Sequence, residues 1–310
     1  MKIESRFAWF GRRIVPIDEA RISILSSSVN YGLAVFEGIR AYWLKDRAEA
    51  LVFRLADHIE RLRRNARILF MDLPLADEEV ADAVLALLAE EAIRGDAYVR
   101  PLLYRADHEL GPCAHIGSSE LSMFATPLAR YANVTDGVRV VVSSWRRTGD
   151  ASIPPRGKIA GSYVNAALAK SEAILAGADD AILLGSDGTV SEATVSNLFA
   201  VRGGRLVTPP VSAGILEGIT RDTVIVLARE LGLEVVERAM GRSELYVADE
   251  LFLVGTATEV APVVEIDRRA VGNGKPGPVA CRLADALDEV VHGRSAKHAS
   301  WCRPVPVANR

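Results

Sequence analysis

Lys158 is the residue whose type and setting most directly suggest chemistry. Lysine is rare in this chain beside arginine, and the other five lysines lie near the termini, in polar turns or on a polar helix face. Lys158 instead follows Pro154-Pro155-Arg156-Gly157 and precedes a small, largely uncharged stretch, residues 159–163. An arginine guanidinium stays protonated, whereas a lysine amine can lose its proton and form a Schiff base with a carbonyl. The setting makes Lys158 a candidate nucleophile, with an ordinary surface lysine as the alternative.

Glu192 is a candidate partner for the group that such a lysine would bind. It lies between a predicted buried strand and a predicted hairpin strand, where a carboxylate is costly unless it is paired. The pyridine nitrogen of pyridoxal phosphate needs an anion to hold its proton, and Glu192 is suited to that role. A glutamate satisfied by backbone amides at a strand edge remains the alternative.

Two short segments are suited to a phosphate. Gly218-Ile219-Thr220 opens a predicted helix, whose first N–H groups would face an anion. Gly255-Thr256-Ala257 follows a predicted strand, and its small residues would let a ligand approach the backbone beside the Thr256 hydroxyl. An ordinary helix cap and an ordinary turn are the alternatives. With Lys158 and Glu192, these segments indicate a pyridoxal-phosphate site.

The pattern of apolar residues, glycines and prolines predicts an α+β fold. We expect Asp57 and Thr220 to be the N-caps of two of its helices. The segment 126–137 contains Pro127, Asn133 and Gly137, which indicates a connection between domains at 1–125 and 137–310, with 126–136 as the interdomain loop. The predicted strands are 21–25, 39–44, 50–55, 97–106, 120–125, 138–142, 181–184, 197–201, 205–208, 234–237 and 250–254; the predicted helices are 58–69, 77–94, 162–175, 221–231 and 278–291.

Composition excludes several classes of protein. A net charge of −3 over 310 residues predicts no nucleic-acid partner, and no apolar run approaches the length of a membrane span. The three cysteines are scattered and the start of the chain does not resemble a signal peptide, so we expect a reducing, cytoplasmic location. No Rossmann or P-loop motif is present. We expect no metal site, with His108 and His115 in a loop and His58, His292 and His298 at the surface.

The combined motifs resemble those of a known enzyme family. Glu192, Asn197-Leu198-Phe199, Leu206, Thr208 and Gly218–Arg221 match, in order and spacing, the signature of fold-type IV pyridoxal-phosphate aminotransferases. The segments 31–42, 97–102 and 255–257 resemble motifs of the branched-chain amino acid aminotransferases in particular. The resemblance covers residues 5 to 305 and implies a small N-terminal α/β sandwich domain followed by a larger, mixed pseudo-barrel domain.

The resemblance also implies roles for individual residues. Lys158 would be the catalytic lysine that holds the cofactor, Tyr163 would donate to its phenolic oxygen, and Glu192 would pair with its ring nitrogen. Leu216 would pack on the ring, and the phosphate would be held by Arg54, Ile219, Thr220 and Thr256. Tyr98 and the amides of Thr256 and Ala257 would bind the substrate's α-carboxylate. Tyr31, Phe36 and Tyr163 would line its side-chain pocket, and Arg100 would bind the distal carboxylate of glutamate.

The implied function is transamination of a branched-chain L-amino acid with 2-oxoglutarate as acceptor, by a homodimer or larger homo-oligomer. Two segments depart from the family pattern: Thr126-Pro127-Leu128-Ala129-Arg130-Tyr131 and the loop 107–119. Because both shape the substrate pocket in relatives, a D-amino acid or (R)-amine transaminase, or a lyase of the same fold, remains an alternative. A non-catalytic binding protein is the third possibility, against which Lys158, Tyr163 and Glu192 argue.

Overall fold

The computed structural model describes residues 3–128 and 136–306, which form two compact units. The first unit comprises the described residues of 1–129, 157–161 and 289–310, and the second comprises those of 130–156 and 162–288. Lys158 therefore packs with the first unit, while the chain on either side of its short segment packs with the second. The domain bounds expected from the sequence stay a prediction, and most of the expected interdomain loop, residues 129–135, lies outside the described residues. No helix among those described is long and apolar enough to cross a membrane.

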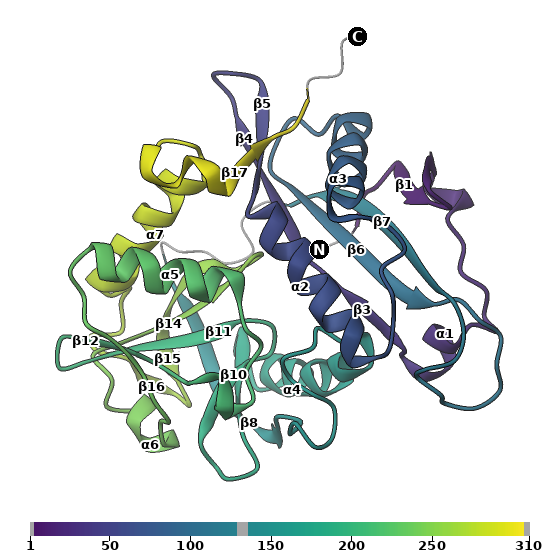
Figure 1. Ribbon diagram of the computed structural model, residues 1–310. Coiled ribbons are helices and arrows are strands. Elements are labelled where there is room, and N and C mark those ends of the chain that lie inside the picture. The colour runs from purple at the N-terminus through teal and green to yellow at the C-terminus, as the bar shows by residue number, and fades with distance from the viewer. Residues whose placement is uncertain (1–2, 129–135, 307–310) are drawn as a thin grey trace. The chain divides into compact units, whose positions relative to one another are not determined.

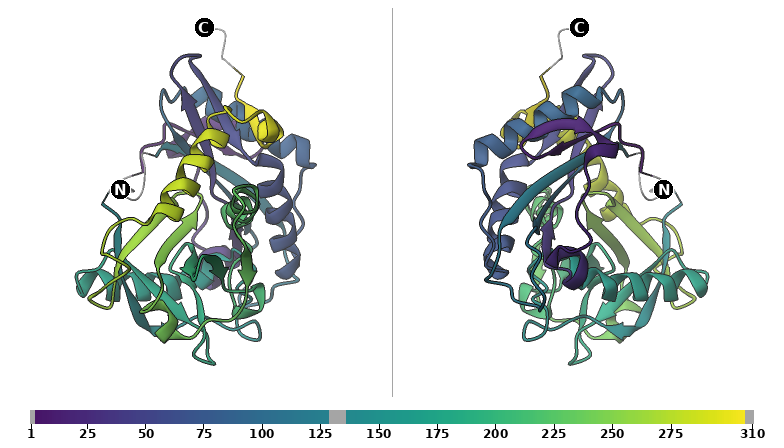
Figure 2. Two further views of the ribbon diagram at one scale, coloured as in Figure 1. Left: turned by 90° about the vertical axis from the view of Figure 1, so that its left-hand side faces the viewer. Right: turned by 90° about the vertical axis from the view of Figure 1, so that its right-hand side faces the viewer.

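The first unit is built on a sheet in which every described pair of strands is antiparallel. The strand order is β17-β5-β4-β6-β7-β1-β2, with β3 paired to β6, so the end of the chain forms one edge and the β1–β2 hairpin the other (Figures 1 and 2). The strands are β1 (Phe7–Phe10), β2 (Arg13–Pro16), β3 (Ala34–Phe36), β4 (Ile39–Leu44), β5 (Glu49–Phe53), β6 (Ala97–Arg105), β7 (Ser119–Pro127) and β17 (Cys302–Pro304).

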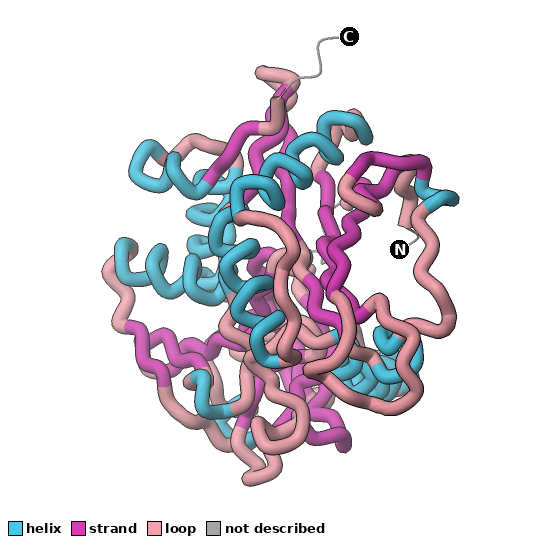
Figure 3. Tube along the Cα trace, turned by 45° about the vertical axis from the view of Figure 1, so that its right-hand side comes forward, coloured by secondary structure: helices cyan, strands magenta, loops and turns pink. Residues whose placement is uncertain are grey.

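Two long helices, α2 (Leu55–Ile68) and α3 (Asp77–Glu91), contact each other and pack against strands of this sheet (helices are cyan in Figure 3). The predicted apolar face of α2 is buried at Ile59, Leu62 and Ala66. Burying each large aliphatic side chain contributes about 1.5–3 kcal/mol, which attaches the helix to the sheet. The shorter elements are α1 (Ser27–Tyr31) and the 3-10 helices η1 (Ile17–Glu19) and η4 (Ala296–Trp301).

Several expectations for the first unit are wrong. Residues 21–25 form no strand: they lead through a turn into α1, and Ile24 and Leu25 are 80% and 60% exposed. Helix α2 begins at Leu55 with Arg54 as its N-cap, so Asp57 lies in the first turn and is not the cap. His58 and His298 are only 1% and 7% exposed, so neither is a surface residue.

The second unit is built on a mixed sheet with the order β10-β9-β8-β15-β14-β11-β12-β13, and β16 pairs with β15. Strand β8 runs parallel to both of its neighbours, and the predicted hairpin of β11 and β12 across Gly203-Gly204 is confirmed. The strands are β8 (Val138–Arg146), β9 (Asp180–Leu184), β10 (Val190–Ala193), β11 (Asn197–Arg202), β12 (Arg205–Thr208), β13 (Val235–Glu237), β14 (Glu250–Gly255), β15 (Glu259–Ile266) and β16 (Arg269–Ala270).

Helices α4 (Tyr163–Leu175) and α5 (Ile219–Glu230) pack against this second sheet. Helix α4 packs on β8 and β9, and α5 packs on β13 and β14. Helix α5 begins earlier than expected, so Gly218 and not Thr220 is its N-cap. The unit also contains η3 (Val211–Ala213) and α6 (Arg242–Leu245), while η2 (Ala160–Ser162) and α7 (Pro278–Val291) each cross the bounds between the two units.

Candidate active site

Lys158 is attached to the edge of β3 by backbone contacts. The amide of Phe36 donates to the Lys158 carbonyl at 3.0 Å, and Val35 and Ile159 form an antiparallel bridge. Gly32 and Gly161 also meet closely, because a Cβ on Gly32 would lie 2.9 Å from the Gly161 Cα. The Lys158 Nζ lies 5.1 Å from the centre of the Phe36 ring, which places the amine against an aromatic face.

Arg100 and Tyr98 join the same cluster from strand β6. They are two residues apart, so their side chains share one face of the strand. Arg100 donates to the Tyr98 hydroxyl through Nε at 3.0 Å and Nη2 at 2.8 Å, and its guanidinium carbon lies 4.4 Å from the centre of the Phe36 ring. A Cβ on Gly38 would lie 2.3 Å from the Tyr98 hydroxyl, so this close packing requires glycine there. Four of the predicted site residues are thus in one place.

A buried ionic group, which the sequence did not reveal, lies next to this cluster. Glu37 accepts from Arg61 Nε at 2.7 Å and Nη2 at 2.8 Å, and its Oε2 lies 2.8 Å from His58 Nδ1. Burial alone would raise the pKa of the Glu37 carboxyl, but the charge of Arg61 and the hydrogen bonds from Arg61 and His58 outweigh it and hold that pKa well below its usual range. Because ionised Glu37 can only accept, His58 Nδ1 carries the hydrogen.

His58 is held in its neutral form in this group. Burial lowers the pKa of the His58 imidazole, and the hydrogen bond to Glu37 only partly offsets that effect. The positive charges of Arg61 and Lys158 act in the same direction as burial. Glu37, which directly follows Phe36, is therefore a buried negative charge that is paired with Arg61.

Two further predicted residues of the first unit lie elsewhere in it. Arg54 links β5 to α2 and donates to Asp57 at 2.9 Å and 2.8 Å. Tyr31 ends α1, is 36% exposed, and accepts from the Gly111 amide at 3.0 Å. Tyr31 thus contacts the loop 107–119. Arg105 also binds this loop, because it donates to the carbonyls of Ala114 and Gly117.

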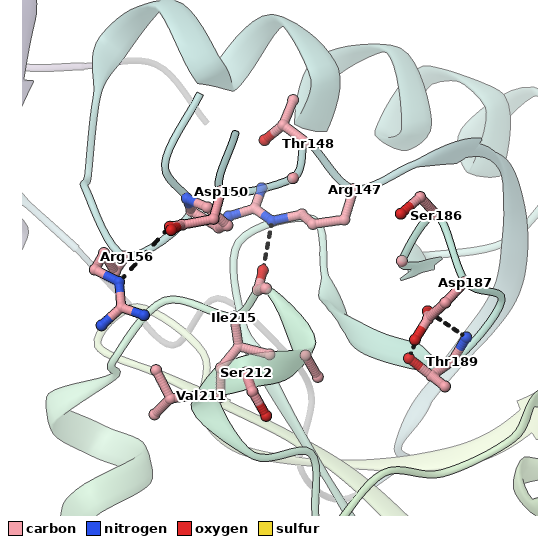
Figure 4. Close-up of a pocket in the computed structure, with 15 residues that line it drawn as sticks. Arg147, Thr148, Asp150, Arg156, Ser186, Asp187, Thr189, Val211, Ser212 and Ile215 are labelled. Carbon is pink, nitrogen blue, oxygen red and sulfur yellow. Dashed lines mark hydrogen bonds and ion pairs between the residues drawn. The ribbon is translucent and has the colours of Figure 1, made fainter. Parts of the chain in front are cut away.

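In the second unit, Glu192 is the centre of a buried polar group. Its Oε1 lies 2.7 Å from Arg147 Nη2, and its Oε2 accepts from Asn197 Nδ2 at 2.8 Å and the Leu216 amide at 3.1 Å. Arg147 also donates to the Gly214 carbonyl at 3.3 Å, the dashed contact beside Ile215 in Figure 4, where it borders a cavity of about 370 Å³. Arg147 was missed in the sequence, although a buried Glu192 required a cationic or amide partner.

Several other predicted residues of this unit lie near Asn197. Asn197 pairs with Val254, one residue before β14 ends at Gly255, so Thr256 and Ala257 follow directly from this part of the strand. A Cβ on Gly218 would lie 2.0 Å from Asn197 Oδ1, which places the N-terminus of α5, with Ile219 and Thr220, directly beside it. Tyr163 opens α4 and is half-buried. The second unit thus brings Glu192 and Leu216 together beside Asn197 and the start of α5, whereas Arg54 and Tyr31 lie apart from the Lys158 cluster in the first unit.

Comparison with known proteins identifies the family. The model of the amino-transferase class IV family matches residues 34–266. A probable branched-chain-amino-acid aminotransferase of Aquifex aeolicus is 46% identical over 300 residues, which cover 96% of each chain. The crystal structure of the branched-chain aminotransferase of Thermoproteus uzoniensis with norvaline superposes with a TM-score of 0.93 at 40% identity, covering 98% of this chain and all of that one.

A second solved structure gives the same result. The branched-chain amino acid aminotransferase of Thermobaculum terrenum, in its holo form with pyridoxal phosphate, has a TM-score of 0.92 and 38% identity, and the match covers 98% of this chain and 100% of that one. The α+β fold and the family expected from the sequence motifs are both confirmed. The chain belongs to the class IV aminotransferases.

Proposed function

We propose that this chain is a branched-chain-amino-acid aminotransferase, which uses pyridoxal phosphate to move the amino group of leucine, isoleucine or valine to 2-oxoglutarate. The names of its relatives in Aquifex aeolicus and Escherichia coli support this substrate class. The observation that carries the proposal is the position of the Lys158 amine against the Phe36 ring, beside the Arg100–Tyr98 pair. This cluster combines a nucleophilic amine, an apolar face and a cation.

The residues of the chain fit pyridoxal phosphate on structural grounds. Glu192 is a buried carboxylate held by Arg147, Asn197 and the Leu216 amide, and it would pair with the ring nitrogen. Helix α5 begins directly after Gly218, which lies against Asn197, and the first N–H groups of a helix are suited to a phosphate. The phosphate would be held by Arg54, Ile219, Thr220 and Thr256, while Tyr163 would donate to the phenolic oxygen and Leu216 would pack on the ring.

The chain's own residues would perform the proton transfers. Pyridoxal phosphate, when bound, withdraws electrons from the α-carbon of the amino acid. Lys158 Nζ would take the proton from that carbon as the general base. The bond from the Phe36 amide to the Lys158 backbone fixes where the lysine side chain starts, and the Phe36 ring limits where it points. Glu192 would keep a negative charge opposite the ring nitrogen throughout.

Substrate recognition would use the same cluster. Tyr98 and the amides of Thr256 and Ala257 would bind the α-carboxylate, and Phe36, Tyr31 and Tyr163 would supply apolar walls. Arg100 lies against the Phe36 ring, so an apolar surface and a guanidinium are adjacent. This adjacency supports a pocket that accepts either an aliphatic side chain or the distal carboxylate of 2-oxoglutarate.

We also propose a homodimer or larger homo-oligomer. The surface around α1 and the loop 107–119 exposes apolar side chains, with Ile24 at 80%, Leu25 at 60% and Leu110 at 100% exposure, and it carries Tyr31. Apolar groups gathered in this way are typical of association surfaces. A partner would cover them and bring Tyr31 to a second active site. Light scattering should give a dimer or larger species; an active monomer at micromolar concentration would contradict the proposal.

A cytoplasmic location belongs to the same proposal. It rests on the three cysteines, none of which forms a disulfide. Fractionation of cells that express the chain with its natural start should recover the enzyme in the cytoplasm, and recovery in an extracellular or periplasmic fraction would refute this.

A substrate panel tests the proposed function. Purified enzyme with pyridoxal phosphate and 2-oxoglutarate is given L- and D-forms of leucine, isoleucine, valine, alanine and aspartate, and glutamate formation is measured. We expect the highest kcat/KM with the branched-chain L-amino acids. A preference for a D-amino acid, or release of product without glutamate formation, would instead indicate the D-amino acid transaminase or the lyase.

A further inference from the structure

Trp301, near the end of the chain, lies directly against Arg54. The Trp301 carbonyl accepts from the Arg54 amide at 2.6 Å. The Arg54 guanidinium carbon lies 5.0 Å from the centre of the Trp301 ring, a distance at which a cation and an aromatic face attract each other. One residue therefore contacts both the backbone and the side chain of Arg54.

Arg54 adopts a backbone conformation that a residue with a side chain rarely takes. Its φ is 49° and its ψ is 41°, in the left-handed region, at the point where β5 ends and α2 begins. Such a conformation persists only where the surroundings fix it. The bond from the Arg54 amide to the Trp301 carbonyl is one contact that does so.

The guanidinium of Arg54 is fixed as firmly as its backbone. Asp57 accepts from its Nε at 2.9 Å and its Nη2 at 2.8 Å, a two-point contact that sets the plane of the group. The hydrogen bonds from Arg54 lower the pKa of the Asp57 carboxyl, although burial opposes them. The Arg54 side chain is 11% exposed, so Asp57 and Trp301 confine it in both orientation and position.

Trp301 is itself held by a neighbour in its own 3-10 helix, His298, and by Phe53 from a distant part of the sequence. Its ring stacks on His298 at 4.1 Å and meets Phe53 edge-on at 6.2 Å. The next residue, Cys302, pairs with Phe53, so β17 adds to the edge of β5 immediately before Arg54. The pairing of β17, the last strand in the described part of the chain, therefore brings Trp301 against Arg54.

We infer that Trp301 is a positioning residue for phosphate recognition: it holds Arg54 in the one conformation in which its guanidinium serves the phosphate of the cofactor. The inference rests on the proposed function, in which Arg54 contacts that phosphate. An arginine already held in place loses little further freedom when the anion binds, so the benefit is specific to ligands that carry the phosphate.

Comparison of two ligands tests this role. Dissociation constants of pyridoxal phosphate and of pyridoxal, which lacks the phosphate, are measured by equilibrium dialysis for wild type, Trp301→Ala and Trp301→Phe. Trp43→Ala is the matched control, since Trp43 is also half-buried and lies in β4 of the same sheet. Circular dichroism and thermal melting show whether each variant is folded.

We expect Trp301→Ala to weaken pyridoxal phosphate binding about three- to tenfold while pyridoxal binding is unchanged. This range corresponds to the cost of ordering one side chain, here Arg54, when the ligand binds. Trp301→Phe should recover most of the loss, and Trp43→Ala should show none of this selectivity. Equal weakening of both ligands, or no weakening in a folded Trp301→Ala protein, would overturn the inference. A wild type that does not bind pyridoxal phosphate would overturn the proposed function itself and, with it, the inference.

Discussion

The Phe36 amide donates a hydrogen bond to the Lys158 carbonyl at 3.0 Å, although the two residues are far apart in the sequence. This bond, with the bridge between Val35 and Ile159, makes the lysine segment an extension of β3. The Lys158 side chain therefore begins at a set position beside β3, and its amine lies 5.1 Å from the centre of the Phe36 ring. An enzyme that depends on one amine benefits from such attachment, because a side chain on a free loop would sample many unproductive positions.

Lys158→Ala should abolish transamination while leaving part of the cofactor affinity. Loss of the amine removes both the covalent attachment and the general base, so kcat should fall by several orders of magnitude. Stopped-flow spectra with L-leucine measure the rate. Lys275→Ala, which changes an exposed lysine in a turn, is the control. Near-wild-type turnover of Lys158→Ala would remove Lys158 from the catalytic role.

Glu192→Gln should slow catalysis at least tenfold and weaken retention of pyridoxal phosphate. The amide can hydrogen-bond to the ring nitrogen but cannot stabilise its positive charge, and a charge-assisted bond is about twice as strong as a neutral one. The substitution also leaves Arg147 without its carboxylate partner at 2.7 Å.

The matched control for this prediction is Glu217→Gln, a half-exposed glutamate that pairs with Arg156 in the same unit. Rate is measured by single turnover and affinity by dialysis, with thermal melting to detect loss of folding. If Glu192→Gln keeps both the wild-type rate and the wild-type affinity, Glu192 serves the fold alone.

Arg100→Ala should slow the half-reaction with 2-oxoglutarate far more than the half-reaction with L-leucine. Loss of a charge-assisted contact costs about 1.5–3 kcal/mol, or roughly ten- to a hundredfold in rate. Only the distal carboxylate of 2-oxoglutarate would lose such a contact. The carboxylate of Glu37 is paired with Arg61 and His58, and Arg100 instead donates to the Tyr98 hydroxyl. Single-turnover spectra with each substrate compare the two half-reactions.

Arg242→Ala offers a matched control, because Arg242 also donates to a tyrosine hydroxyl, that of Tyr246, at 2.6 Å, in the second sheet's unit. It should leave both half-reactions unchanged. Equal slowing of both half-reactions by Arg100→Ala would show that Arg100 supports the fold and does not read the substrate.

His58→Gln should reduce the loss of stability on mild acidification. The folded-state pKa of His58 is lowered, chiefly by burial, so its contribution to stability is present above its unfolded pKa of about 6.5 and is lost as the pH falls toward the folded value. Glutamine carries no titrating group. The free energy of unfolding, measured in urea at pH values of about 7 and of about 5 to 6, should therefore fall less in the variant than in wild type.

His108→Gln, which changes a histidine in the loop 107–119, should keep the wild-type pH dependence. The low pKa of Glu37 adds a second loss of stability only at more acidic pH, below its unfolded pKa of about 4.3. The free energy of unfolding of His58→Gln, again measured in urea, could instead fall between neutral and mildly acidic pH as much as that of wild type. That result would contradict the neutral, buried state assigned to His58.

The sequence is sufficient for those features that depend on neighbouring residues. Two glycines between two apolar strands predict the hairpin of β11 and β12, and the structure confirms the turn at Gly203 and Gly204. The family motifs predict site residues around Lys158 and Glu192 because each motif is a short, ordered run. By contrast, the alternating pattern of residues 21–25 resembles a strand, yet no neighbouring strand pairs with it in the described structure and its isoleucine and leucine side chains are exposed.

The parts that the sequence does not reveal depend on pairs distant along the chain. A helix rich in charged residues suggests an exposed His58, but Glu37 and Arg61 enclose it. Arg147 meets Glu192, and Trp301 meets Arg54, across separations that no local pattern reveals. A buried carboxylate in the sequence signals that a partner exists, but only the fold identifies it.

Chemical reduction of the loaded enzyme can show directly which lysine holds the cofactor. The chain contains six lysines, at positions 2, 45, 158, 170, 275 and 297. Enzyme loaded with pyridoxal phosphate is reduced with borohydride, which fixes the cofactor to its lysine, and the digested peptides are mapped by mass spectrometry. We expect a phosphopyridoxyl group on Lys158, with at most traces elsewhere. A principal label on any other lysine, or a protein that remains unlabelled, would contradict it.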